Sequence, residues 1–153
     1  HMRLRETGPL GYGKHGSFEG FCSGSGIAHL AKIKLNDASS DNLVKRAGGI
    51  DGINARLIAD LAYQGDEFCR SIYTESGRML GYGLSILIDI LNPELIIIGS
   101  IFTRCSDLLS KYTNEVIKKE ALKLSSDVCK VVSSKLGDSI GDISAISVAT
   151  GMF

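Results

Sequence analysis

Apolar residues recur at helical spacing through most of the first 91 residues. The pattern predicts three helices, over residues 25–34, 52–64 and 67–91, because in each the apolar side chains return every three or four positions and share one face. Asp51 and Asp66 are suited to cap the second and third helices, since a carboxylate accepts the free N–H groups of a first turn. The third helix has few charges in its second half, so we expect it to be buried on most sides.

Three glycines interrupt the middle of the longest predicted helix. Gly77, Gly81 and Gly83 each cost up to ~1 kcal/mol relative to alanine inside a helix. We interpret them as positions where another element packs closely against the helix. Approach of a ligand to the helix backbone is the alternative.

The second half of the chain alternates between strands and helices. Residues 94–99 read Glu-Leu-Ile-Ile-Ile-Gly, and an aliphatic run of this kind is typical of a parallel strand that is buried on both faces. An amphipathic helix over residues 106–124, a second strand over 128–132 and a last helix over 143–150 follow. This order predicts an α/β fold with parallel pairing through a helical crossover.

Glycine dominates the start of the chain. Seven of the 18 glycines lie within the first 26 residues, which indicates a loop and not a regular element. We therefore divide the chain into a Gly-rich loop, residues 1–26, and an α/β domain, residues 27–153. Within that domain, residues 36–49 are polar and are expected to form an exposed connection with room for one helical turn.

Charge balance and cysteine usage narrow the class of protein. The 17 basic and 17 acidic side chains cancel, whereas a protein that works on nucleic acid or on an anionic membrane carries a basic excess. No apolar run approaches the ~20 residues of a membrane span, and no targeting leader is evident. The four cysteines are widely separated, which favours reduced thiols in a cytoplasmic protein over a disulfide framework.

Two places in the chain have the chemistry of a ligand site. Gly99 and Ser100 follow the apolar strand, and ligands of open α/β sheets collect at the carboxyl ends of strands. Glu19 lies in the Gly-rich loop, where its carboxylate is suited to accept hydrogen bonds from neighbouring sugar hydroxyls; an ordinary exposed glutamate is the alternative. The histidines lack the spacing of metal ligands: His15 could reach a ligand from the loop, and His29 is expected to be structural.

Three segments, taken in order, resemble the ROK family of sugar kinases and sugar-responsive transcriptional regulators. The first runs from Gly-Pro-Leu at residues 8–10 to Glu19 and continues into Cys-Ser-Gly at residues 22–24. The second is the helix-to-strand element at residues 91–99, and the third is Leu-Gly-Asp at residues 136–138, followed by Gly141. Together they extend the resemblance over nearly the whole chain.

The resemblance implies the carboxyl-terminal half of a protein with the RNase H-like, actin/hexokinase-type fold, in which sugar and ATP bind between two domains. It implies that Glu19 contacts the sugar, together with His1 if that residue is native and not a remnant of cloning. Gly99 and Ser100 correspond to the adenosine site, with Ser100 in place of the family's second glycine. Such proteins use ATP with magnesium in the cytoplasm and usually form homodimers. No contact with a membrane or with nucleic acid is expected from this domain.

The Gly-rich loop departs from the family pattern. The family's zinc-binding cysteines are replaced here by Gly11, Gly13 and Ser17, so no zinc is expected. A structural zinc site contributes folding energy to its surroundings, so this loop must be held in another way. We expect packing of Tyr12 and Phe18 to hold it.

The second departure from the family pattern concerns the catalytic groups. The phosphate-binding loops and the catalytic aspartate precede the matched region in the family, and Asp37 follows the signature loop, so we interpret it as a loop aspartate. We therefore predict the carboxyl-terminal domain of an ATP-dependent hexose or N-acetylhexosamine kinase, with no catalytic residue of its own and no activity alone. The alternative is the effector-binding or dimerisation domain of a ROK transcriptional regulator; loss of the zinc cysteines favours the kinase.

Overall fold

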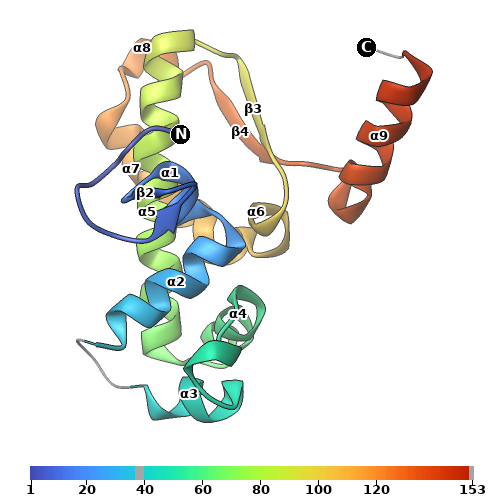
Figure 1. The fold of residues 1–153 in the computed structure, drawn as a ribbon. Coiled ribbons are helices and arrows are strands. Elements are labelled where there is room, and N and C mark those ends of the chain that lie inside the picture. The colour runs from blue at the N-terminus through green and yellow to red at the C-terminus, as the bar shows by residue number, and fades with distance from the viewer. Residues whose placement is uncertain (37–39, 152–153) are drawn as a thin grey trace.

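The computed structural model describes residues 1–36 and 40–151 and consists of a body of helices with a small sheet on one side and a last helix standing apart (Figure 1). The predicted α/β class with parallel strand pairing is confirmed. The strands are β1 (Leu10–Gly11), β2 (Lys14–His15), β3 (Leu95–Ile98) and β4 (Lys130–Ser133). The helices are α1 (Phe18–Cys22), α2 (Gly24–Lys34), α3 (Asp41–Ala47), α4 (Ala55–Tyr63), α5 (Glu67–Leu91), α6 (Ile101–Arg104), α7 (Ser106–Glu120), α8 (Lys123–Ser126) and α9 (Ile140–Thr150), with short 3-10 turns η1 (Ile50–Gly52) and η2 (Gly137–Ser139).

The central element of the helical body is α5, which has the bounds that the sequence predicts. Asp66 caps it, because its carboxylate accepts a hydrogen bond from the N–H of Cys69 at 3.0 Å. The prediction that Asp51 caps the preceding helix is wrong: Asp51 lies in η1, and the side chain of Asn54 caps α4 by accepting from the N–H of Leu57 at 3.0 Å. Asn54 is the residue with the extended backbone that a cap requires. Over the described ranges, no helix combines the length and the apolarity needed to cross a bilayer.

Close packing explains the three glycines of α5. A Cβ atom at Gly81 would lie 2.6 Å from the Cβ of Val116 in α7, and one at Gly83 would lie 2.5 Å from the ring of Phe18 in α1. A Cβ atom at Gly77 would likewise lie 2.9 Å from a backbone oxygen of α7. The packing interpretation is therefore confirmed.

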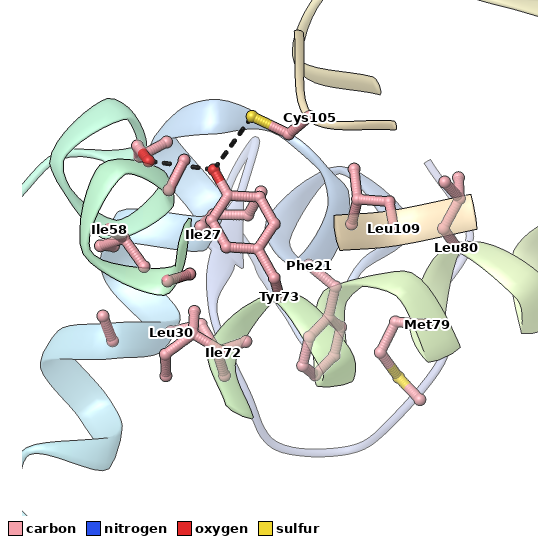
Figure 2. Packing of buried hydrophobic residues seen from close by; sticks show 14 of the residues in the cluster. Phe21, Ile27, Leu30, Ile58, Ile72, Tyr73, Met79, Leu80, Cys105 and Leu109 are labelled. Carbon is pink, nitrogen blue, oxygen red and sulfur yellow. Dashed lines mark hydrogen bonds between the residues drawn. The ribbon is translucent and has the colours of Figure 1, made fainter. Parts of the chain in front are cut away.

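Side chains from five helices meet in one core around Tyr73 (Figure 2). The Tyr73 hydroxyl donates a hydrogen bond to the carbonyl oxygen of Ala55 at 2.9 Å and lies 3.6 Å from Sγ of Cys105. A buried hydroxyl needs such a partner, so this ring joins α5 firmly to the start of α4. The other large side chains that are fully buried include Phe21, Ile27, Leu43, Ile58, Leu61, Ile72, Met79, Ile88 and Leu109.

The small sheet pairs β3 and β4 in parallel, with Leu95 opposite Lys130. The prediction that the first of these strands is buried on both faces is wrong for one face. Ile96 and Ile98 pack against the helical core, whereas Leu95 and Ile97 are 50% and 61% exposed. A sequence records how apolar a strand is, but the burial of each face depends on what packs against it.

The predicted helix over residues 106–124 is divided in two. α7 ends at Glu120, and the backbone turns extended at Ala121, with a ψ of 151°. The next residue, Leu122, donates its N–H to the carboxylate of Asp89 in α5 at 2.8 Å, so the interruption is held by a contact from a distant part of the chain. Helical spacing alone cannot indicate such a contact.

The glycine-rich start of the chain folds as a small hairpin followed by α1. β1 and β2 pair around a two-residue turn, Tyr12 and Gly13, both with positive φ (47° and 73°). The prediction that Tyr12 packs to hold the loop is wrong, since its side chain is 83% exposed, whereas Phe18 packs against α5 as predicted. Backbone hydrogen bonds hold the segment as well, among them one from the N–H of Phe18 to the carbonyl of Met2 at 2.8 Å.

The polar connection after α2 is more ordered than the sequence predicts. It contains the seven residues of α3, and Leu43 of that helix is fully buried. Asp37, interpreted above as a loop aspartate, lies outside the described residues.

Candidate functional site

A cavity of about 330 Å³ brings together the two candidate ligand-binding places of the sequence. Glu19 of α1 lines it, as do Gly99 and Ser100 after β3. We call it the Glu19 cavity. Its apolar wall is formed by Phe18, Leu80, Ile98, Ile101, Phe102 and Leu109.

Glu19 is held at the mouth of this cavity by the short helix α1. The side chain of Ser17 caps the helix by accepting from the N–H of Gly20 at 3.0 Å. Ser76 of α5, which is buried and lines the same cavity, donates its hydroxyl to the carbonyl of Phe21 at 2.9 Å. These bonds fix the backbone of α1, while the Glu19 residue itself stays exposed. A carboxylate in this position offers acceptor sites to a ligand without having to break a bond within the protein.

The turn after β3 has a strained backbone. Ser100 has a φ of 53° and a ψ of −126°, in a region that glycine adopts much more readily than serine. Such a conformation costs about 1–3 kcal/mol and is found most often at ligand sites. Thr103 steadies the turn by donating its hydroxyl to the carbonyl of Ile98 at 3.2 Å. The backbone geometry at Ser100 therefore favours glycine, the residue that the ROK pattern has at this position.

A second cavity, of about 650 Å³, adjoins the first and shares Ser100 and Ile101 with it. Arg56, Asp60 and Tyr63 of α4 line it. We call it the Tyr63 cavity. Arg104 and Cys105 at the end of α6 also line it, together with Gly24, Ala55 and Ala59.

The α4 residues of the Tyr63 cavity, unlike Ser100, are not among the site residues predicted from the sequence. Arg56, Asp60 and Tyr63 are spaced by four and three positions, so they form one stripe along α4, beside the buried stripe that contains Ile58 and Leu61. A polar stripe on an amphipathic helix ordinarily faces solvent. Only the arrangement in space shows that it borders a cavity next to Ser100.

The four cysteine thiols, of which Cys22 and Cys105 line these cavities, stay protonated at neutral pH. Burial, assisted by the nearby Glu19 carboxylate, raises the pKa of the Cys22 thiol. Burial also raises the pKa of Cys69 to about 12, and it raises the pKa of Cys105 and Cys129. All four thiols are free, as predicted. Because the thiolate is the reactive form, none of these thiols is prepared to act as a nucleophile.

None of the three histidines lines the Glu19 cavity. His1 lies beside the hairpin, with its ring centroid 6.2 Å from that of Tyr12, and it does not line the cavity. His15 lies 3.1 Å from a backbone carbonyl oxygen through Nδ1, and Nδ1 of His29 accepts a backbone N–H at 3.1 Å. In the part of the chain that the structure describes, no three His, Cys, Asp or Glu side chains are grouped so as to hold a metal ion.

Comparison with known proteins gives relatives of two kinds. The chain is 28% identical over 139 residues to the DNA-binding transcriptional repressor Mlc of Escherichia coli K12. It is 26% identical over 149 residues to a glucokinase of Thermotoga maritima. These alignments include 90% and 97% of this chain but 33% and 47% of the relatives, so the chain spans between a third and a half of their length.

The same likeness holds in three dimensions. The crystal structure of a ROK family glucokinase from Streptomyces griseus, in complex with glucose and AMPPNP, matches with a TM-score of 0.76 and 25% identity. The match covers 99% of this chain and 50% of that one. The sequence profile of the ROK family matches residues 1–151. This chain therefore belongs to the ROK family.

Proposed function

We propose that the chain is the carboxyl-terminal half of an ATP-dependent kinase for a hexose or N-acetylhexosamine, with the RNase H-like fold, and that it supplies sugar and adenosine contacts. One observation carries the proposal: Glu19 and the Gly99–Ser100 turn line one cavity, and Ser100 also lines the cavity next to it. Phosphoryl transfer needs two substrates in adjoining sites, because catalysis depends on holding the reacting groups side by side.

The Glu19 cavity is the proposed sugar site. A carboxylate accepts hydrogen bonds at both oxygens, which suits two neighbouring hydroxyl groups of a sugar ring. The apolar wall, which includes Phe18 and Leu80, would face the C–H groups of the ring. The volume of about 330 Å³ lies at the lower end of the range for small-molecule sites, which is ~300–1,000 Å³. His1 remains a proposed sugar contact of the intact protein.

The Tyr63 cavity is the proposed nucleotide site. Its tyrosine offers an aromatic face on which a base can stack, and stacking of this kind is worth about 1–3 kcal/mol. Arg56 and Arg104 add positive charge for phosphate groups. Ser100 lines both cavities, whereas Gly99 lines the Glu19 cavity alone, so of the two proposed adenosine contacts Ser100 is the one that borders this site. The glucokinase relative that was crystallised with glucose and AMPPNP supports a pair of sites of this kind.

The chemical step belongs to the intact protein. We assign no catalytic residue to this chain: the general base and the phosphate-binding loops would come from the part of the ROK relatives that it does not span. ATP with magnesium is the proposed phosphoryl donor. The proposal also includes a homodimer and a cytoplasmic location for the intact protein, both of which the family resemblance implies.

A second function is favoured by one observation. The Mlc repressor is among the relatives, at 28% identity. The chain would then be the effector-binding or dimerisation domain of a sugar-responsive regulator. The two functions differ at the Tyr63 cavity, because a kinase needs a nucleotide there and an effector domain needs only the sugar. The intact reading frame also separates them: an upstream phosphate loop with Asn-Asp indicates a kinase, and a helix-turn-helix indicates a regulator.

Titration calorimetry of the chain with glucose, N-acetylglucosamine and AMPPNP tests the proposal. Glu19→Gln should weaken sugar binding about tenfold or more, because it removes a charged acceptor of hydrogen bonds, and should leave AMPPNP binding unchanged. Tyr63→Ala should weaken AMPPNP binding and leave sugar binding unchanged. Glu115→Gln and Tyr82→Ala are the matched controls, since both residues are exposed and lie outside the two cavities.

The outcome of these titrations distinguishes the kinase from the effector domain. Binding of a sugar and AMPPNP, each weakened by its own variant, supports the kinase. Binding of a sugar without AMPPNP supports the effector domain. If neither ligand binds at millimolar concentration, or if Glu19→Gln binds sugar as the parent does, the assignment of the Glu19 cavity is wrong.

A further inference from the structure

A third cavity, of about 530 Å³, lies on the other side of α5 from the Glu19 cavity. Ser76 and Leu80 of α5 line the Glu19 cavity, whereas Thr74 and Arg78 line this one. Because an α-helix has about 3.6 residues per turn, residues two positions apart point to opposite sides of it. We call this third space the Arg78 cavity. It shares no lining residue with either of the cavities described above.

Charge distinguishes the Arg78 cavity from the chain as a whole. Acidic and basic side chains are equal in number over the full sequence. Four cationic side chains and two carboxylates line this cavity, which leaves an excess of two positive charges. Such an excess in one concave surface attracts anions. The cations are Arg5 before the hairpin, Lys34 at the end of α2, and Arg70 and Arg78 of α5, and the carboxylates are Glu67 and Glu75 of α5.

The ion pairs within the cavity neutralise only part of this charge. Glu75 contacts two cations at once, Nη1 of Arg5 at 2.7 Å and Nζ of Lys34 at 2.6 Å. One negative charge is therefore shared between two positive ones. Glu67 contacts Arg70 at 3.3 Å, and both side chains of this pair are at least half exposed, so the pair is weak.

The rest of the excess lies on Arg78. The carbon atom of its guanidinium group lies 5.9 Å from the centre of the Tyr112 ring in α7. Among the described residues, no carboxylate forms an ion pair with Arg78. A cation–π contact uses none of the N–H donors of a guanidinium, so these donors remain available to a ligand. In the same part of the chain, the hydroxyl groups of Thr74 and Tyr112, which also line the cavity, have no hydrogen-bond partner.

The donors of the cavity match a phosphate group. A guanidinium donates two parallel hydrogen bonds to phosphate oxygens, and hydroxyl groups add further donors. The cavity volume of about 530 Å³ lies inside the range for small-molecule sites, which is ~300–1,000 Å³. The two carboxylates are suited to accept hydrogen bonds from hydroxyl groups elsewhere on the ligand. This combination favours a small phosphorylated molecule that also carries hydroxyl groups.

We propose that the Arg78 cavity binds a phosphate monoester of a small hydroxylated molecule. Arg78 and the hydroxyl groups of Thr74 and Tyr112 donate hydrogen bonds to the phosphate. Arg5 and Lys34 add attraction through the positive charge that their shared carboxylate leaves uncompensated. The inference does not rest on the proposed function, because this cavity is separate from the proposed sugar and nucleotide sites.

Titration calorimetry of the chain with glycerol 3-phosphate tests the site, and glycerol is the matched neutral compound. In phosphate-free buffer of low ionic strength, glycerol 3-phosphate should bind at millimolar concentration and glycerol should not. Arg78→Gln should weaken binding about tenfold or more, because it removes charged hydrogen-bond donors. Arg46→Gln on α3 is the matched control, since Arg46 is also exposed and lines none of the three cavities, and it should retain binding.

A second variant should change the affinity in the opposite direction. Glu75→Gln removes the carboxylate that competes with phosphate for Arg5 and Lys34. It should strengthen binding of glycerol 3-phosphate about two- to fivefold, in keeping with the modest strength of partly exposed ion pairs. Weaker binding by a folded Glu75→Gln chain would contradict the proposed site.

Nuclear magnetic resonance locates the phosphate without relying on the variants. Addition of glycerol 3-phosphate should shift the backbone amide signals of Thr74 and Arg78 and leave those of Gly99 and Ser100 in place. If circular dichroism shows that Arg78→Gln is unfolded, these shifts decide the question. Shifts at Gly99 and Ser100 alone would overturn the proposal.

Three further results would also overturn it. The first is no binding of glycerol 3-phosphate at millimolar concentration, and the second is equal binding by the parent chain and a folded Arg78→Gln. The third is loss of binding in Arg56→Gln with Arg78→Gln unaffected, which would place the phosphate in the Tyr63 cavity. Binding of hexaglutamate in place of glycerol 3-phosphate would be a case of the first result and would assign the cavity to an acidic polypeptide.

Discussion

The helical body and the sheet with α9 use the same kinds of residue in opposite ways. Ile27, Ile58 and Ile72 in the helical body are fully buried, whereas Ile97 of β3 and Ile146 of α9 are both 61% exposed. The body also satisfies its buried polar groups internally, as the Tyr73 hydroxyl illustrates (Figure 2).

The difference shows where the fold is complete in this chain. Burial of apolar surface is the main stabilising term in folding, so most of the stability of this chain comes from the helices around α5. The β3–β4 sheet and α9 have the composition of buried elements without the burial. The Glu19 cavity lies at the boundary between the two regions, because α1 belongs to the body and Gly99 and Ser100 follow β3.

The largest expected contrast comes from the same substitution made in each region. Ile72→Ala should lower the free energy of unfolding by about 2–5 kcal/mol, since it leaves a cavity in a packed core. Ile97→Ala should lower it by less than about 0.5 kcal/mol, since the side chain is already in contact with water. Urea denaturation of the chain measures both. Equal losses would mean that the two regions are equally packed, contrary to the structure.

A smaller contrast is expected between two glycines. Gly81→Ala should destabilise by about 1–3 kcal/mol, because its Cβ would meet Val116 and the backbone of α7. Gly141→Ala in α9 meets no atom within 4 Å and removes a poor helix former, so it should be neutral or stabilising by up to about 1 kcal/mol. Urea midpoints at an unchanged m-value check the signs. A stabilising Gly81→Ala would contradict the packing of α5 against α7.

The smallest effect concerns the boundary between the regions. Ser100→Gly should raise stability by about 0.5–1 kcal/mol, because relief of the left-handed backbone exceeds the added freedom of glycine in the unfolded chain. Ser100→Ala is the control: it removes the same hydroxyl but keeps the strain, so it should give no gain. Thermal unfolding compares the two variants, and an equal rise in Tm for both would show that the backbone is not strained.

Much of the fold follows from periodic patterns within single segments. The spacing of apolar residues predicts α5 to its bounds, and the aliphatic run predicts β3 and its parallel pairing. The errors arise where a distant segment decides the outcome. Asp89 holds the chain extended beyond the end of α7, and the outer face of β3 is exposed because nothing in the described chain packs on it.

The candidate site was predictable to a similar degree. Gly99 and Ser100 are marked by their place after an apolar strand, and Glu19 is marked by the resemblance of its loop, so these three could be named from the sequence and share a cavity. The sequence could not identify the three residues of α4 that line the Tyr63 cavity, Arg56, Asp60 and Tyr63. An exposed helical stripe and a cavity lining have the same pattern in sequence. Their relation to Ser100 depends on how α4 and α6 pack.

The raised pKa values of the four thiols have a practical consequence for chemical labelling. Alkylating reagents and most oxidants attack the thiolate, so the raised pKa values make the native cysteines less reactive at neutral pH than an ordinary exposed cysteine. One added, exposed cysteine can therefore be modified in preference to the four native thiols. An exposed position such as Ile97 on β3 would carry a fluorophore or spin label there without prior removal of the native thiols.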